Sequence, residues 1–242
     1  MNNSSNKGGC CETTNSFLVP LQGAVLIIIL VCAGLSLMLN SEKALITILG
    51  LSLTHFKIWQ PLTATFCHFE LWHLLFNCLA IWMFGSQLES LWKTKKFALF
   101  FITTATVANV IWIIYVWLFN EPTTLLISIG ASGGVYAILY AYAYFWPDNP
   151  IWFFGFFAIK AKIFICIIAF IDIFNVISSQ YSTSNHVVHL SGLAIAAIWI
   201  DLTCNGRMTL WIRKKYDFLI FKKKTSHLTL IKGKLGKDDP VN

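Results

Sequence analysis

The chain has 242 residues, of which 57% are hydrophobic and only 12% are charged, and its mean hydropathy is +0.67. Soluble domains carry about 25% charged residues, so this composition excludes a soluble globular domain and predicts an integral protein of the lipid bilayer. The formal net charge is +7, but ten of the eighteen Lys and Arg residues lie between Arg207 and Lys237. This basic tail suits the anionic cytoplasmic leaflet and does not indicate a nucleic-acid partner.

Six apolar runs have about the length needed to cross a ~30 Å hydrocarbon core. They cover residues 17–40, 71–91, 97–119, 130–147, 162–178 and 186–204. The sequence therefore predicts an all-α, polytopic bundle of six transmembrane helices, in a membrane domain of residues 17–204. Residues 1–16 form a polar N-terminal tail and residues 205–242 a basic cytoplasmic tail.

Two connections are predicted to have structure of their own. Residues 40–69 contain Trp59, Pro61 and Phe66, and this aromatic, amphipathic composition predicts a loop lying partly in the membrane interface. Residues 151–159 are predicted to form an interfacial turn or short helix before the fifth span, or to lengthen that span. The 40–69 loop and the fifth helix are the predicted lateral gates.

The basic residues of the short connections predict the orientation. Lys93, Lys95 and Lys96 follow the second run, and Lys160 and Lys162 precede the fifth. Together with the C-terminal tail they predict that both termini are cytoplasmic. No cleavable targeting sequence is recognisable, which favours a bacterial inner membrane, with a eukaryotic secretory membrane as the alternative.

A serine flanked by glycines begins the fourth run. Gly130 and Gly133 on either side of Ser132 would let a helix or an extended peptide approach its hydroxyl, which suits either tight packing or catalysis. Gly192 would let the sixth helix approach the face formed by Gly133 and Gly134 and bring His189 within hydrogen-bond reach of Ser132. A serine nucleophile needs such a base, so a Ser-His dyad is predicted.

Further polar groups are expected at the depth of this serine. His73 and Asn77 share a face of the second helix because they are four residues apart, and His68 stands just before that helix. Free backbone N–H groups at the start of the fourth helix, with Asn77 and His68, could stabilise an oxyanion. Tyr136, one turn after the serine, is expected to pack against the imidazole of His189.

Several motifs in fixed order resemble the rhomboid intramembrane proteases over residues 55–204. They are Trp59-Gln60, His68 to Asn77, Phe84-Gly85, Leu88-Glu89, Gly130-Ala131-Ser132-Gly133, Tyr136 and His189-Leu190-Ser191-Gly192. The resemblance implies a rhomboid-like bundle in which Ser132 is the nucleophile and His189 the base. It also implies that His68 and Asn77 are oxyanion donors, that His73 holds the helix arrangement and that Glu89 is structural.

Two positions depart from that pattern. Gln60 stands where the family usually has arginine, so arginine-dependent anchoring of the loop is expected to be missing. Ala196 replaces the second glycine of a Gly-x-x-x-Gly pair in the last helix, and alanine still permits close packing. Neither change removes a predicted catalytic group.

The predicted function is hydrolysis of peptide bonds in single-span membrane proteins, with no metal or organic cofactor. The alternatives are a non-catalytic rhomboid-like binding or scaffold protein, a metal site near Cys67, His68 and His73 or near His186 and His189, and a transport path. Asp172 is expected to lie deeper than His189 and to make a structural hydrogen bond rather than complete a triad.

Overall fold

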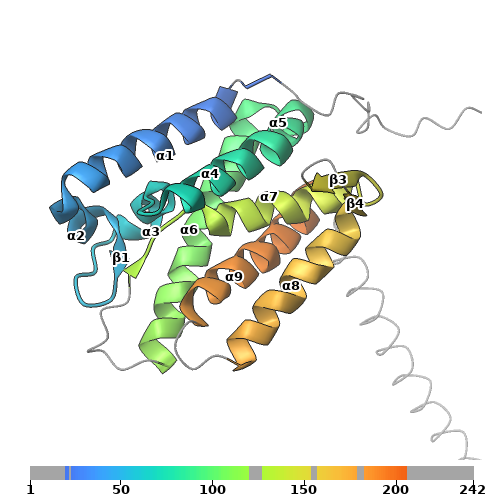
Figure 1. Ribbon diagram of the computed structural model, residues 1–242. Coiled ribbons are helices and arrows are strands. Elements are labelled where there is room, and N and C mark those ends of the chain that lie inside the picture. Colours follow the sequence, from blue (N-terminus) through green and yellow to red (C-terminus); the bar gives the residue numbers. More distant parts are fainter. Residues whose placement is uncertain (1–19, 22, 120–126, 154–156, 179–182, 206–242) are drawn as a thin grey trace, which may run out of the picture. The chain divides into compact units, whose positions relative to one another are not determined.

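A computed structural model describes residues 20–21, 23–119, 127–153, 157–178 and 183–205 (Figure 1). The predicted tail 1–16 lies outside these residues, and so does the predicted tail 205–242 except for Asn205. The chain divides into two compact units, Met1–Ala197 and Ile198–Asn242. Of the second unit, the described part consists of the last residues of α9 and a π-helical turn, η4 (Asp201–Asn205).

Helices dominate the described residues, so the predicted all-α membrane fold is confirmed (Figure 1). The long helices lie close to the predicted runs. They are α1 (Gly23–Ser41), α4 (Leu71–Ala80) continuing through η3 (Ile81–Gly85) into α5 (Ser86–Trp92), α6 (Thr94–Phe119), α7 (Ser132–Phe145), α8 (Ala161–Ser178) and α9 (Thr183–Ile200). Lys93, at a φ of 69°, makes the tight turn between α5 and α6.

Four helical segments among the described residues are long and apolar enough to cross a membrane. They are Leu71–Trp92, Thr94–Phe119, Ala161–Ser178 and Asn185–Thr203. The apolar part of α1, Gly23–Leu39, is shorter, and α7 has 14 residues. At 1.5 Å per residue α7 is about 21 Å long, so a count of six complete spans stays a prediction.

The segment between α1 and α4 is built from short elements. These are η1 (Lys43–Leu45), α2 (Ile46–Leu49), β1 (Leu51–Ser52), α3 (Gln60–Thr63) and η2 (Ala64–Phe66). Gln60 is fully buried: its Oε1 accepts the Lys57 N–H at 3.0 Å, and its Nε2 donates to the Thr47 carbonyl at 3.1 Å. The neutral amide thus ties two parts of the loop together where an arginine anchor was expected to be missing.

The connection between α7 and α8 differs from the prediction of a turn or short helix over 151–159. It contains an antiparallel hairpin of β3 (Pro150–Phe153) and β4 (Phe157–Lys160), in which Ile151 pairs with Ile159. Pro147 and Pro150 disfavour helix there, and the aromatic and β-branched residues that follow suit strands. Asp148, just before the hairpin, forms ion pairs with Lys160 at the end of β4 at 3.3 Å and with Lys162 of α8 at 2.8 Å.

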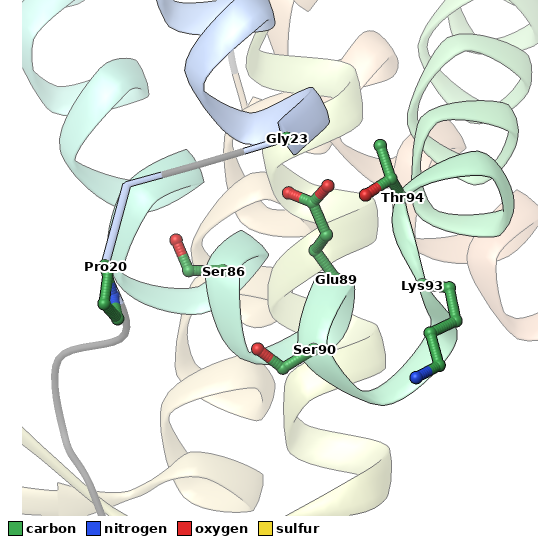
Figure 2. A pocket seen from close by; sticks show the side chains of 7 residues that line it. All are labelled: Pro20, Gly23, Ser86, Glu89, Ser90, Lys93 and Thr94. Carbon is green, nitrogen blue, oxygen red and sulfur yellow. The ribbon is translucent and has the colours of Figure 1, made fainter.

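Glu89 of α5 caps the start of α1. Its Oε1 accepts the Ala24 N–H at 2.7 Å and its Oε2 accepts the Val25 N–H at 3.0 Å. Figure 2 shows this carboxylate pointing to the end of α1 at Gly23, beside Thr94. The start of a helix has N–H groups without partners and a positive dipole end. The Glu89 carboxylate accepts two of these N–H groups, and its negative charge is favourable beside the dipole.

A buried hydrophobic cluster on α6 contacts both the 40–69 loop and α9. Ala108, Trp112 and Val116 of α6 form a buried cluster with three residues from elsewhere: Leu51 of β1, Ala64 of η2 and Val188 of α9. One turn of α9 separates Val188 from Gly192, so this cluster fixes the part of α9 that faces α7.

Candidate functional site

Ser132 is the first residue of α7 and follows a short strand. β2 (Ile127–Ser128) pairs antiparallel with β1, with Leu51 opposite Ser128. Gly130 then turns the chain at a φ of 121°, and its N–H donates to the Ala64 carbonyl at 2.9 Å. Only glycine adopts this φ readily, so the turn that presents the serine requires Gly130.

The same glycine leaves room for His73 of α4. A Cβ atom on Gly130 would lie 2.6 Å from His73 Cε1 and 3.0 Å from its Nε2. One turn further along α4, Asn77 is buried and its Nδ2 donates to the His73 carbonyl at 2.8 Å. The imidazole of His73 therefore lies directly beside the turn that carries Ser132, with Asn77 behind it on the same helix.

His68 makes a different contact. Its side chain is only 1% exposed, and its Nε2 accepts the backbone N–H of Ala131 at 3.2 Å. Burial, together with the nearby His73, lowers the pKa of His68 to about 4, so the ring is neutral at physiological pH. Since Nε2 accepts, the proton of the neutral ring lies on Nδ1, which is 3.4 Å from Ser36 Oγ.

α9 approaches α7 as closely as the sequence led us to expect. A Cβ atom on Gly192 would lie 2.2 Å from the carbonyl oxygen of Gly133. A Cβ atom on Gly133 would lie 3.0 Å from Val188 and 3.1 Å from Ala108, so α7 packs against α6 and α9 at this point. Gly134, expected on the same contact face, lies against Phe101 of α6 instead, and the atoms nearest to Gly192 all belong to Gly133.

His189 is held on two sides. Its ring stacks on Tyr136 of α7, with centroids 4.1 Å apart and planes within 10°. Its Nδ1 is 3.3 Å from Asp172 Oδ1 of α8. Asp172, expected to lie deeper than His189 and to make a structural hydrogen bond, is therefore within hydrogen-bond distance of the His189 ring.

Ser132 and His189 are both described residues, and no hydrogen bond joins the Ser132 hydroxyl to the His189 ring. The two are linked instead through the glycine contact: Ser132 adjoins Gly133, and His189 precedes Gly192 by three residues on α9. Catalytic hydrogen bonds are often longer before substrate binds, so this arrangement is compatible with a serine and its base.

His189 also belongs to a cluster of three side chains of the types that bind metal ions. The donor atoms of Asp172, His186 and His189 lie within 4.8 Å of one another. However, Asp172 Oδ1 is already 2.5 Å from His186 Nδ1 and 3.3 Å from His189 Nδ1, as expected for hydrogen bonds rather than for three ligands around one ion. The alternative cluster of Cys67, His68 and His73 is not among the groups that could hold a metal in the described part of the chain.

Comparison with known proteins identifies the same region. Residues 55–206 match the model of the Rhomboid domain. A segment of 95 residues is 28% identical to "Rhomboid protein 1, mitochondrial" of Saccharomyces cerevisiae, and it covers 38% of this chain and 27% of that protein. The match thus spans about a quarter of the relative's length, while the domain match contains Ser132, His189, His68, His73 and Asn77.

Proposed function

Because the Rhomboid domain covers more than half of its length, this chain belongs to the rhomboid family of membrane proteins, and we propose that it is an intramembrane serine protease. Ser132 is the nucleophile and His189 the general base. The observation that carries the proposal is the contact of Gly192 with the backbone of Gly133, because it brings the start of α7 against the turn of α9 that bears His189.

The reaction follows from these two side chains. His189 removes the proton from the Ser132 hydroxyl as its oxygen attacks the substrate carbonyl, and then returns that proton to the leaving amine. The resulting acyl-enzyme is hydrolysed when His189 takes a proton from water, which attacks the ester carbonyl. The ester bond to Ser132 then breaks, and His189 returns the proton to the serine oxygen as the carboxylic acid product leaves. The stacking of Tyr136 on His189 supports this role because it restricts the imidazole to one plane. The mechanism invokes no metal or organic cofactor.

The oxyanion donors are proposed to be His73, Asn77 and the backbone N–H of Ser132. His73 lies beside Gly130, and the first N–H groups of α7 have no partner within the helix. For His68 the geometry favours a positioning role over the donor role expected from sequence. Its Nε2 accepts the Ala131 N–H and has no proton to donate, so it tethers the residue before the nucleophile.

Single-span membrane proteins are the proposed substrates. A transmembrane helix hides its peptide bonds, so a substrate must unwind locally to expose the scissile carbonyl. Within α8, only Ala161 and Asp172 are buried, which supports α8 as a movable wall through which a substrate enters sideways. A disulfide crosslink that holds α8 against the neighbouring α7 should suppress cleavage, and undiminished turnover would contradict this entry route.

Orientation and location are proposed on charge alone. Lys93, Lys95, Lys96, Lys160 and Lys162 lie in connections that the positive-inside rule assigns to the cytoplasm, which would put Ser132 toward the outer side of a bacterial inner membrane. Protease accessibility of tags at the two termini, in intact and permeabilised cells, tests this orientation. Digestion of either tag in intact cells would contradict it.

The proposed activity is tested by incubating the detergent-purified chain with a model transmembrane substrate. Wild-type protein should cleave it, and Ser132→Ala should not. The second candidate, a non-catalytic rhomboid-like scaffold, predicts that neither protein cleaves any substrate while both bind it equally. Equal cleavage by the two proteins would mean that Ser132 is not the nucleophile.

A further inference from the structure

Asp172 is the feature of α8 that the proposed reaction does not use. It is 2% exposed, whereas most of α8 presents apolar side chains outward. A buried carboxylate in an apolar helix is costly unless it accepts hydrogen bonds, so a partner for it must lie on a neighbouring helix.

Two histidines of α9 are those partners. Asp172 Oδ1 is 2.5 Å from His186 Nδ1 and 3.3 Å from His189 Nδ1. The two rings are 6.0 Å apart and nearly perpendicular, at 89°, so they approach the same oxygen from different directions. A carboxylate oxygen has two lone pairs and can accept both N–H groups.

We propose that Asp172 is a positioning residue for His189, an inference that rests on the proposed serine protease function. By accepting from Nδ1–H, the carboxylate selects the tautomer whose Nε2 has a free lone pair. Nε2 is then the nitrogen that takes the Ser132 proton. Tyr136 restricts the plane of the ring, and Asp172 fixes its rotation within that plane.

The carboxylate has a second effect on the reaction. When His189 takes the serine proton it becomes a cation, and the negative charge of Asp172 beside Nδ1 stabilises that cation. The base is therefore assisted by a carboxylate of a third helix, and the site works as an Asp-His-Ser set rather than as an isolated pair.

A purely structural role would instead have Asp172 tie α8 to α9, and kinetics can separate the two roles. We compare full-length wild type, Asp172→Asn, Asp172→Glu and His186→Gln in detergent, by the rate of fluorophosphonate labelling and by cleavage of a transmembrane substrate. Asn175→Ala is the control, because Asn175 lies one turn away on α8 and, among the described residues, its side chain bonds to the Ile171 carbonyl of its own helix alone.

Asp172→Asn should lower the labelling rate and kcat by about 10²-fold with KM unchanged, because a positioned base contributes about 10²–10⁴-fold. Asp172→Glu should recover part of this loss, and Asn175→Ala should react like wild type. His186→Gln breaks the shorter of the two bonds to the carboxylate but leaves the His189 bond, so it should lose no more than about threefold, well short of a positioned base's contribution.

Three results would overturn the proposal. Wild-type labelling with equal labelling of Asp172→Asn would remove the role of Asp172 and leave the protease function intact. If Asp172→Asn does not fold, a loss in His186→Gln of about 10²-fold would assign both residues to structure. Absence of labelling in wild type would refute the protease function and this inference together.

Discussion

Replacing Gly192 with alanine perturbs the helix contact on which the proposed reactive geometry depends. The added Cβ would lie 2.2 Å from the carbonyl oxygen of Gly133, whereas an ordinary contact begins at 3.4 Å. Because backbone atoms cannot rotate out of the way, α9 and α7 must separate by about 1.2 Å. His189 moves with α9, while Ser132 stays with α7.

A misplacement of about 1 Å between reacting groups costs about 10²-fold in rate, or about 2.7 kcal/mol of activation free energy. We therefore expect Gly192→Ala to lower kcat/KM for a transmembrane substrate by about 10²-fold. Overpacking should also reduce the free energy of unfolding by about 1–3 kcal/mol. Both are measured in detergent, by substrate cleavage and by thermal denaturation.

Gly34→Ala is the matched control, because in the described part of the chain no atom outside the adjoining backbone of α1 lies within 4 Å of a Cβ added at Gly34. This variant should keep wild-type activity and be at least as stable as wild type, because alanine is favoured over glycine inside a helix. If Gly192→Ala cleaves as fast as Gly34→Ala, the glycine contact does not set the distance between Ser132 and His189, and the reasoning is refuted.

Three other predictions concern the frame around the site. Glu89→Ala leaves the Ala24 and Val25 N–H groups uncapped and should lower the free energy of unfolding by about 2 kcal/mol or more, and an unchanged melting temperature would contradict the capping role. Gln60→Leu removes the two Gln60 side-chain bonds, to Lys57 and Thr47, that tie two parts of the 40–69 loop together, so limited proteolysis there should become faster; equal rates would show that these bonds do not hold the loop. Burial lowers the pKa of His68 from 6.5 to about 4, so the unfolded chain binds a proton first as pH falls. The free energy of unfolding should be constant above pH 6.5 and fall by up to about 3 kcal/mol between pH 6.5 and 4. The melting temperature measured across this range should follow the same trend in wild type and change less with pH in His68→Gln.

The helices could be predicted because a bilayer demands apolar runs of one length, and α6 and α8 begin and end within a few residues of the predicted runs. The 150–160 hairpin could not, because short apolar and aromatic segments suit strand, turn or helix alike. The prolines around Asp148 were the available signal against helix.

Much of the site could be predicted because its contacts follow local rules. Gly192 against Gly133 follows from small residues at helix crossings, and Tyr136 over His189 from the one-turn spacing to Ser132. These contacts are present in the structure, whereas the catalytic roles of the residues stay predictions.

Two features of the site could not be predicted, because they depend on how distant segments meet. The bond from Ala131 N–H to His68 joins residues 63 positions apart. The contact of Asp172 with His189 depends on how far α8 is shifted along α9. Counting residues from the helix ends cannot give this shift, because it assumes that the two helices are equally tilted and end at the same depth. The sequence did contain one signal for this contact. Asp172 is the only acidic residue in its apolar run, so a hydrogen-bond donor was to be expected beside it.

The central claim is that Ser132 is a nucleophile activated by His189. The most direct measurement is fluorophosphonate labelling of the detergent-purified full-length chain, with the modified residue mapped by mass spectrometry. We predict that wild type is labelled at Ser132, that Ser132→Ala is not labelled, and that His189→Ala loses labelling while keeping its fold. Labelling at another residue, or labelling of Ser132 that is unchanged in His189→Ala, would contradict the account.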